Sequence, residues 1–569
     1  MSDMERAGKK AIILGLDGAT FDVLKPRVVH EQMPNLAALL KDGVWGELQS
    51  TIPPFSAQAW VSLATGKNQA RHGVVDFWER LPAQTPNQRH RFVTAKSIQA
   101  ETLWQIVGRH GLQVGIVNVP ITYPPSVVNG YLVSGFLTPQ GRDDFVYPST
   151  LRAEIEALDP DYNPDPFDPL GTSRQQILDI VRWMERHEEV GRYLADKYPP
   201  DLFFSVIQAL DHVQHLFWDH VVDKAGKGTV ASLVNRCYEL ADDAIGYRRQ
   251  MMDGQTSLFL VSDHGFGAAR KWFHVNQFLQ ERGFLVLDEA QSAGLGSMMA
   301  RLGITPQRFR NLVRRLDVLG LRRRMGRLGR VTLGRRIDNA LLAPIDWERT
   351  EAISGSPATE GIFVNLKGRE PRGIIEPGAD YEAVRQRLLQ ELTSLCDPGT
   401  GERVVRAVYR REDLYNGPFL DRLPDVIFDL GEGPYLASDA LPLPLSARGR
   451  GPEEAVLEPL PRNLLQGRHQ PMGIFVASGP NIRRGGKRPL EGARIIDVAP
   501  TILYALGLPI PDDMDGRPLL EIFDPDFVAT HPVCYATAEP AGAAKPEPQY
   551  DQEEASEMER RLRGLGYVG

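Results

Sequence analysis

The chain has 569 residues and is 42% hydrophobic, which is ordinary for a globular protein and allows one large domain with insertions or two or three domains. The formal net charge of −8 excludes a general binder of polyanions, so no specific nucleic acid partner is predicted. The three cysteines lie far apart without metal-type spacing, which gives no sign of a disulfide framework or a cysteine zinc site.

The first predicted element is a buried strand over residues 11–16. The preceding segment MSDMERAGKK lacks the apolar stretch of a signal peptide, and no later apolar run approaches about 18 residues, so we expect a cytoplasmic protein. The strand ends in Asp17. Because binding sites in open α/β sheets lie at the carboxyl ends of strands, Asp17 is a candidate site residue.

Residues 51–73, TIPPFSAQAWVSLATGKNQARHG, place Ser56 at the start of a predicted helix. The apolar residues that follow recur at helical spacing, so Ser56 is predicted to be the helix N-cap. A hydroxyl at a helix N-terminus faces unpaired backbone N–H groups, which is also where a phosphate is readily held. Ser56 is therefore either a cap alone or a nucleophile that meets a phosphoryl group.

Further along, predicted helices alternate with predicted strands, which favours an α/β sheet covered by helices on both faces. The predicted helices span residues 34–40, 102–109, 173–196 and 233–252, and the strands are VGIVNVP, DLFFSVIQ and SLFLVS. The second of these strands leads to Asp211 and His215, and the third leads to Asp263 and His264. Carboxylate and imidazole side chains thus follow more than one of the predicted strands.

The composition changes between residues 286 and 340. Within this stretch, residues 301–336 contain many arginines and a single acid, Asp317. This pattern predicts a basic helical insert. One interpretation is that its arginines are solvated or paired with acids elsewhere in the chain. The other is that they attract anionic substrates, such as phospholipid head groups or nucleotides, and that the insert makes a weak contact with anionic lipid.

The insert divides the predicted core into two parts. We predict a catalytic core over residues 1–285 and 341–525, the second part containing the strands GIFVNL, RVVRAV, PDVIFDL and MGIFVASG and a closing helix in IIDVAPTILYALG. Residues 526–569 are predicted to form a linker rich in Ala, Pro and Glu and a short charged C-terminal helix.

Six carboxylates and imidazoles stand at strand ends or in glycine-rich turns. They are Asp17, Asp211, His215, Asp263, His264 and His469. Each residue alone is more often a cap or a hydrogen-bonded loop residue than a ligand. Together they are oxygen and nitrogen ligands that suit zinc, with manganese or iron as alternatives. Two divalent metal ions about 4 Å apart would flank a phosphoryl group and activate Ser56.

In this order the motifs resemble the alkaline phosphatase superfamily, in its type I phosphodiesterase and nucleotide pyrophosphatase branch. The matching stretches are LGLDGA, Ser56 ten residues before Gly66, RHG at residues 71–73, LDHVQH, SDHGF, GRHQPMGIFVASGP and DVAPTILYALGLPIPDDMDG. They extend from residue 11 to about residue 519, the insert excepted. The resemblance implies a three-layer α/β/α sandwich of alkaline phosphatase type carrying the helical basic insert.

The resemblance also implies how the ligands are shared between the metals. One ion is held by Asp17, Asp263 and His264 together with Ser56, and the other by Asp211, His215 and His469. In nucleotide pyrophosphatases an Asn that contacts the phosphoryl oxygen stands where this chain has Phe77. This chain therefore either lacks a side chain that donates a hydrogen bond to the phosphoryl oxygen or supplies one from another position.

Three polar residues of the loop after the nucleophile helix, Lys67, Asn68 and Arg71, are the nearest candidates for binding substrate. The alternative is that they form a solvated loop. Thr122, Tyr123, Arg142 and Lys271 are further candidates for lining the pocket, and His72, His212 and His220 are assigned to structural roles.

We predict a metal-dependent hydrolase that acts on a small phosphate ester, preferentially a phosphodiester, through a phosphoseryl intermediate. A phosphomutase or phosphomonoesterase of the same superfamily is an alternative. A sulfatase is less favoured because FSAQAW lacks the C/S-x-P-x-R motif. A binding protein without turnover is disfavoured because all seven chemical positions are intact. The sequence carries no signal for the oligomeric state.

Overall fold

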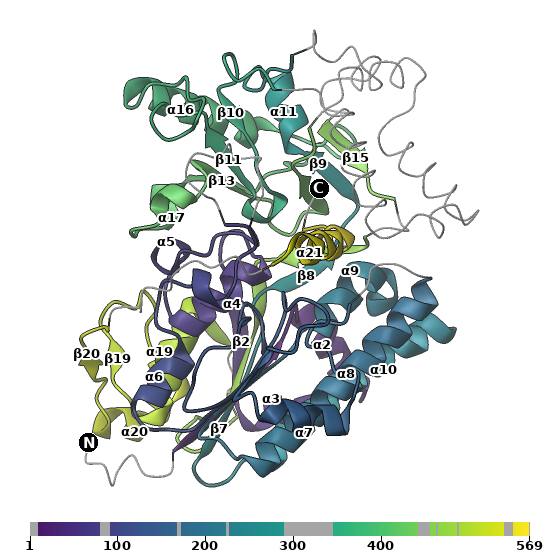
Figure 1. The fold of residues 1–569 in the computed structure, drawn as a ribbon, viewed down its shortest axis with the longest axis vertical. Coiled ribbons are helices and arrows are strands. Elements are labelled where there is room, and N and C mark those ends of the chain that lie inside the picture. The colour runs from purple at the N-terminus through teal and green to yellow at the C-terminus, as the bar shows by residue number, and fades with distance from the viewer. Residues whose placement is uncertain are drawn as a thin grey trace.

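The computed structural model describes residues 9–79, 91–167, 172–223, 227–288, 345–441, 456–461, 465–485, 489–539 and 550–567. A nine-stranded sheet dominates the lower part of the molecule (Figure 1). Its strands are, in spatial order, β18 (Leu490–Arg494), β2 (Val44–Gln49), β17 (Met472–Ser478), β7 (Thr256–Val261), β1 (Lys10–Leu16), β6 (Leu202–Ile207), β3 (Val114–Val119), β4 (Gly130–Ser134) and β5 (Val146–Tyr147).

Helices cover both faces of this sheet (Figure 1). On one face lie α2 (Phe21–Val29), α3 (Pro34–Asp42), α7 (Leu151–Leu158), α8 (Ser173–Lys197), α9 (Ala209–Val222) and α10 (Thr229–Gln250). On the other lie α4 (Ser56–Thr65), α6 (Leu103–Arg109) and α19 (Val498–Leu506). The three-layer α/β/α sandwich predicted from the sequence is confirmed.

The alternation of side chains along β1 explains why the sheet needs two layers of helices. Ile12, Leu14 and Leu16 belong to one buried hydrophobic cluster, whereas Ala11 and Ile13 belong to the cluster on the opposite face. A strand that is apolar on both faces is stable only when both are covered. Such a strand therefore sits in the middle of the sheet, between β6 and β7.

The strand directions bring the motif-bearing chain segments to one edge of the sheet. β1 pairs in parallel with both β6 and β7, so the carboxyl ends of these three strands lie side by side. β17 runs antiparallel to β7 and to β2, so its first residues and the end of β2 reach the same edge. Five chain segments therefore converge at this edge, as expected for an α/β site.

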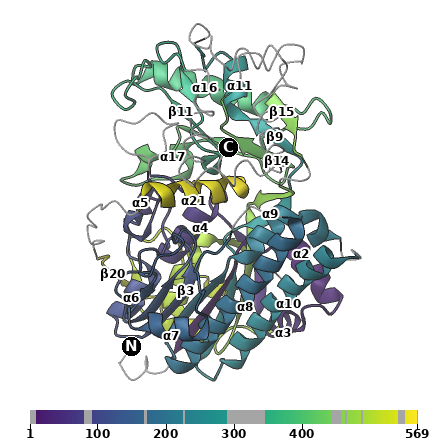
Figure 2. The ribbon, with the colours of Figure 1, turned by 45° about the vertical axis from the view of Figure 1, so that its right-hand side comes forward.

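A separate region lies above the sandwich (Figures 1 and 2) and has its own hydrophobic cluster. It contains a four-stranded sheet in the order β10 (Ala352–Ile353), β11 (Gly361–Val364), β13 (Val426–Asp429), β12 (Ala407–Arg410), and a three-stranded sheet in the order β14 (Tyr435–Ser438), β9 (Lys271–His274), β15 (Leu457–Pro459). Its helices are α11 (Val275–Glu281), α16 (Ala379–Ser394) and α17 (Arg411–Leu414).

The strands GIFVNL and PDVIFDL, which the sequence analysis placed in the second part of the core without assigning them to a sheet, pair with each other in this region. Their apolar character shows that they are buried, but it carries no information about which sheet they join. MGIFVASG does join the central sheet, as β17.

The predicted basic insert falls almost wholly on residues 289–344, outside the described residues. The predicted C-terminal helix is present as α21 (Gln552–Gly564), with Asp551 capping its first turn. In both views α21 lies between the sandwich and the upper region (Figures 1 and 2). Within the described residues, no helix combines the length and the apolar character needed to cross a bilayer.

The remaining elements are short. In the described ranges they are α5 (Gln69–His72), α20 (Pro525–Thr530), β8 (Gly265–Ala268) paired with β16 (Gly467–Gln470), and β19 (Ile510–Pro511) paired with β20 (Tyr535–Ala536), together with five single turns of 3-10 helix. The β8–β16 pair matters for the site, because it holds His469 opposite Phe266 beside the end of β7.

Candidate active site

Ser56 is the first residue of α4, and its side chain does not cap the helix. Phe55 occupies the N-cap position and forms no side-chain capping bond. The prediction of Ser56 as N-cap is therefore wrong by one residue. The Ser56 hydroxyl is fully buried and instead lies 3.1 Å from Nε2 of His264. Because the Ser56 hydroxyl does not cap the helix, it is available to act as a nucleophile.

Asp17 and Asp263 lie beside the His264 nitrogen that faces the Ser56 hydroxyl. Nε2 of His264 lies 3.5 Å from Oδ1 of Asp17 and 3.1 Å from Oδ2 of Asp263. All four side chains are completely buried. This first cluster is formed where β1 and β7 end and where the chain turns from β2 into α4.

Asp211, His215 and His469 form a second cluster beside the first. Oδ1 of Asp211 lies 3.1 Å from Nε2 of His469 and 3.4 Å from Nε2 of His215. The two imidazole Nε2 atoms are 3.0 Å apart. Asp211 and His215 share one face of α9, as their spacing of four predicts, and the rings of His264 and His469 stack at 3.6 Å, which joins the clusters.

The donor sets of both clusters fit a metal ion. The donor atoms of Asp17, Asp263 and His264 all lie within 4.8 Å of one another, as do those of Asp211, His264 and His469, and His215 adds to the second set. Tetrahedral ligands at zinc distances stand roughly 3.3–3.6 Å apart. The separations given above fall close to that range.

The tautomers of His264, His215 and His469 also favour metal binding. Nδ1 of His264, His215 and His469 lies 3.0, 3.1 and 2.9 Å from a backbone carbonyl oxygen, those of Gly265, Gly467 and Pro54. A carbonyl only accepts, so each Nδ1 carries the proton and each Nε2 directs a lone pair into the site. Two lone pairs 3.0 Å apart repel each other unless a cation lies between them. This is the arrangement of metal-binding histidines.

Burying the negatively charged carboxylates of the site is energetically unfavourable unless a cation lies beside them. Desolvation, with the nearby charge of Asp263, raises the pKa of Asp17 well above its usual range, and desolvation raises the pKa of Asp263 to about 8. Desolvation lowers the pKa of His469 to about 4, so this ring is neutral at pH 7. Oδ1 of Asp17 and Oδ2 of Asp263 accept no hydrogen bond. Bound cations would compensate these carboxylates.

Neighbouring donors hold the first carboxylates in place. Nε1 of Trp60 donates to Oδ2 of Asp17 at 3.0 Å, and the backbone N–H of Gly18 donates to Oδ1 of Asp263 at 3.2 Å. Trp60 is one turn along α4 from Ser56, so the helix that carries the serine also orients Asp17. The orientation of the Asp17 carboxylate therefore depends in part on a tryptophan of the same helix as Ser56.

The structure does not bring Lys67, Asn68 and Arg71 into hydrogen-bond contact with either cluster. Lys67 pairs with Asp513, and Asn68 Nδ2 donates to Oδ2 of Asp515 at 2.8 Å. Nε of Arg71 lies 3.1 Å from Oδ1 of Asp515. These contacts fix the loop to the chain after α19, and a role in binding substrate stays a prediction for all three residues.

The other candidates are engaged away from Ser56. Arg142 forms a bidentate pair with Glu554 of α21, and Lys271 pairs with Asp397. His72 accepts from or donates to Ser62 at 2.9 Å, and desolvation lowers its pKa to about 3. His72 is therefore a neutral structural histidine, in agreement with the sequence analysis.

One site residue was missed by the sequence analysis. The hydroxyl of Tyr567 lies 3.1 Å from Oδ2 of Asp211, 3.1 Å from Nε2 of His469 and 3.5 Å from Oγ of Ser56. It comes from the turn after α21, more than 500 residues from the nucleophile. The sequence pattern identifies the charged helix before it, but no local motif marks a tyrosine after a helix as a site residue.

Comparison with known proteins identifies the family. Residues 11–449 match the type I phosphodiesterase / nucleotide pyrophosphatase family. No curated protein sequence matches significantly. Because the match covers most of the chain, the protein belongs to this family, which confirms the resemblance drawn from the motifs. It is an enzyme of the phosphodiesterase and pyrophosphatase class that hydrolyses phosphoryl compounds.

The comparison with solved structures finds two distant relatives among its matches. An inactive variant of murine ectonucleotide pyrophosphatase / phosphodiesterase 5 in complex with AMP is 14% identical, with 91% of this chain and 100% of that chain covered and a TM-score of 0.45. Phosphonoacetate hydrolase from Sinorhizobium meliloti 1021 in complex with phosphonoacetate is 15% identical, with 88% and 95% covered and a TM-score of 0.47.

Proposed function

We propose that this protein is a two-metal hydrolase of phosphate esters that works through a phosphoseryl intermediate. The observation that carries the proposal is a fully buried Ser56 hydroxyl 3.1 Å from His264, beside two joined clusters that together offer six oxygen and nitrogen donors. Asp17, Asp263, His264 and Ser56 would hold one divalent ion, and Asp211, His215 and His469 the other, zinc first and manganese as the alternative.

When bound, the ions supply Lewis acidity, which lowers the pKa of the Ser56 hydroxyl and stabilises charge on the phosphoryl and leaving oxygens. Oγ of Ser56 then forms a bond to phosphorus as the ester oxygen departs, and a water molecule later cleaves the Ser56–phosphorus bond. The N-terminus of α4 directs its free backbone N–H groups toward the same phosphoryl group. No histidine of the site is required as a general acid.

We infer that a phosphodiester is preferred over a monoester. A monoester brings one more negative charge, and enzymes that favour it generally add an arginine or another cation at the phosphoryl group. Arg71 and Arg142, the two arginines of the described chain that the sequence made candidates for this role, are paired with Asp515 and Glu554. Phe77 is fully buried, and its apolar ring packs against Tyr567, whose hydroxyl lies 3.5 Å from Oγ of Ser56. This environment suits a second ester substituent.

The diester preference is tested with two chromogenic substrates. We expect kcat/KM for bis-p-nitrophenyl phosphate to exceed that for p-nitrophenyl phosphate. A monoester preference of about tenfold or more, equal to about 1.4 kcal/mol in transition-state stabilisation, would replace the proposal with a phosphomonoesterase. Assays with phosphorylated sugars or polyols, in which isomerisation is measured against phosphate release, separate the phosphomutase alternative, which would use the same serine.

A further inference from the structure

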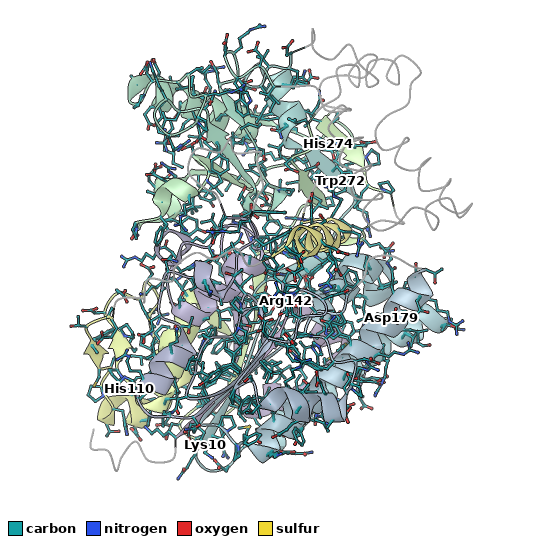
Figure 3. The ribbon with its side chains drawn as sticks, viewed as in Figure 1. Lys10, His110, Arg142, Asp179, Trp272 and His274 are labelled. Carbon is teal, nitrogen blue, oxygen red and sulfur yellow. The ribbon has the colours of Figure 1, made fainter. Side chains whose placement is uncertain are left out.

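The C-terminal segment, residues 550–567, docks onto the sandwich and ends inside the site. Arg561 of α21 is buried and lies 3.1 Å from Oδ2 of the buried Asp165. Arg142, labelled in Figure 3, holds Glu554 through two hydrogen bonds of 2.6 and 3.0 Å. The Tyr550 hydroxyl donates to the carbonyl oxygen of Leu137 at 2.9 Å. Three polar anchors therefore fix the approach of this segment.

The ring of Tyr567 is enclosed by aromatic side chains. Its centroid lies 4.7 Å from that of Phe77, 6.2 Å from Phe55 and 6.5 Å from Phe136. The residue is 2% exposed. A phenol held in this way has few alternative orientations, so its hydroxyl points at the clusters without further cost in conformational entropy.

The Tyr567 hydroxyl lies between the proposed nucleophile and the second cluster. It reaches Oγ of Ser56 on one side and Asp211 and His469 on the other. Among the described residues, only His264 and Tyr567 bring a side-chain hydrogen-bonding group to Oγ of Ser56. His264 directs its Nε2 lone pair inward, so Tyr567 is the side chain that brings a hydrogen-bond donor, which donates to Oδ2 of Asp211 in this structure.

At 3.5 Å, the contact with Ser56 itself is at the limit of a hydrogen bond. A non-bridging oxygen on a phosphorus atom bonded to Oγ stands about 2.5 Å from Oγ, so an oxygen on the side that faces Tyr567 is within reach of a hydrogen bond from this hydroxyl. Donors aimed at the position of developing charge, not at the resting nucleophile, are those that accelerate a reaction.

We propose that Tyr567 is a catalytic residue, whose hydroxyl donates a hydrogen bond to a non-bridging oxygen of the phosphoryl group during transfer to and from Ser56. This inference rests on the proposed function. The Ser56–phosphorus bond forms and the ester bond breaks as described above, and the proton stays on Tyr567 throughout. The chain thereby supplies from its C-terminus a polar contact that Phe77 does not provide.

The opposite account of the same contacts is that Tyr567 blocks the site and leaves when substrate binds. Ser56 is fully buried, so a covering segment has to move before a substrate reaches it in either account. The two accounts predict opposite signs. If Tyr567 donates a hydrogen bond to the phosphoryl group, removing its hydroxyl lowers turnover. If Tyr567 blocks the site, weakening its contacts raises turnover.

Tyr567→Phe separates them, because it removes the hydroxyl and keeps the ring among its aromatic neighbours. We expect kcat for bis-p-nitrophenyl phosphate to fall roughly tenfold to a hundredfold with a smaller change in KM, and vanadate to bind more weakly by calorimetry at unchanged metal content. Tyr504→Phe is the matched control, since its hydroxyl donates to the carbonyl oxygen of His531 in another part of the fold. Its kinetics should equal those of the wild type.

Arg561→Met supplies a second test through docking of the segment. It leaves Asp165 without its buried partner, so α21 should be held less firmly and turnover should fall in the same direction. Turnover at or above the wild-type value in Tyr567→Phe, or a rise in Arg561→Met, would overturn the proposal. If Ser56→Ala is inactive in the same assay, only this inference fails; if Ser56→Ala is active, the proposed function fails.

Discussion

Ser56→Ala should reduce kcat/KM for a phosphodiester by about 10³-fold or more, because the oxygen that forms the bond to phosphorus is gone. Asp17, Asp263 and His264 keep their positions at the ends of β1 and β7, so the variant should still hold about two metal ions per chain, as the wild type should. Steady-state kinetics and elemental analysis of the same preparation test both statements together.

Ser62→Ala is the matched control for this variant. Ser62 lies on the same helix and is as fully buried as Ser56, but its hydroxyl is paired with His72 at 2.9 Å. It should retain turnover close to that of the wild type. Near-normal turnover in a Ser56→Ala protein with its full metal content would leave Ser56 as a structural residue and remove the nucleophile from the account.

His469→Ala should lose about one metal ion per chain and almost all activity, because two protein ligands are insufficient to hold the second ion. Asp211→Ala should have the same effect. Treatment of the wild type with a chelator should abolish turnover, and zinc or manganese should restore it. Elemental analysis and metal titration followed by calorimetry provide a readout that does not depend on activity.

His274→Ala is the control for the loss of a histidine. His274, labelled in Figure 3, lies in the upper region and its Nε2 faces Glu458 at 3.3 Å. Its substitution should leave metal content and kinetics unchanged. Active wild-type protein that contains no stoichiometric metal would contradict the two-metal proposal, whatever the effect of the substitutions.

The convergence of the site could be predicted because its three carboxylates come soon after buried strands. Asp17 directly follows β1, Asp263 lies two residues after β7, and Asp211 lies in the first turn of the helix after β6. Parallel pairing of β1 with β6 and β7 then brings these strand ends together, as the topology of α/β sheets requires. The order of the motifs and the pattern of buried strands were therefore sufficient to predict that these ligands meet at one edge of the sheet.

The rest depends on contacts between distant parts of the chain, which local patterns do not encode. The apolar runs of β11 and β13 predict burial but not the sheet that buries them. The exact start of α4 at Ser56 is set by tertiary contacts, since propensity places helix ends only to within about two residues. Tyr567 enters the site because α21 docks through Arg561 and Glu554, pairs that the sequence of the helix alone does not predict.

The stereochemical course at phosphorus tests the central claim most directly. A single enantiomer of an aryl phosphorothioate diester is hydrolysed in isotopically labelled water, and the configuration of the product is determined. Two in-line displacements, first by Ser56 and then by water, invert the phosphorus twice, so the account predicts retention. Inversion would mean that water attacks the substrate directly, which contradicts a phosphoseryl intermediate.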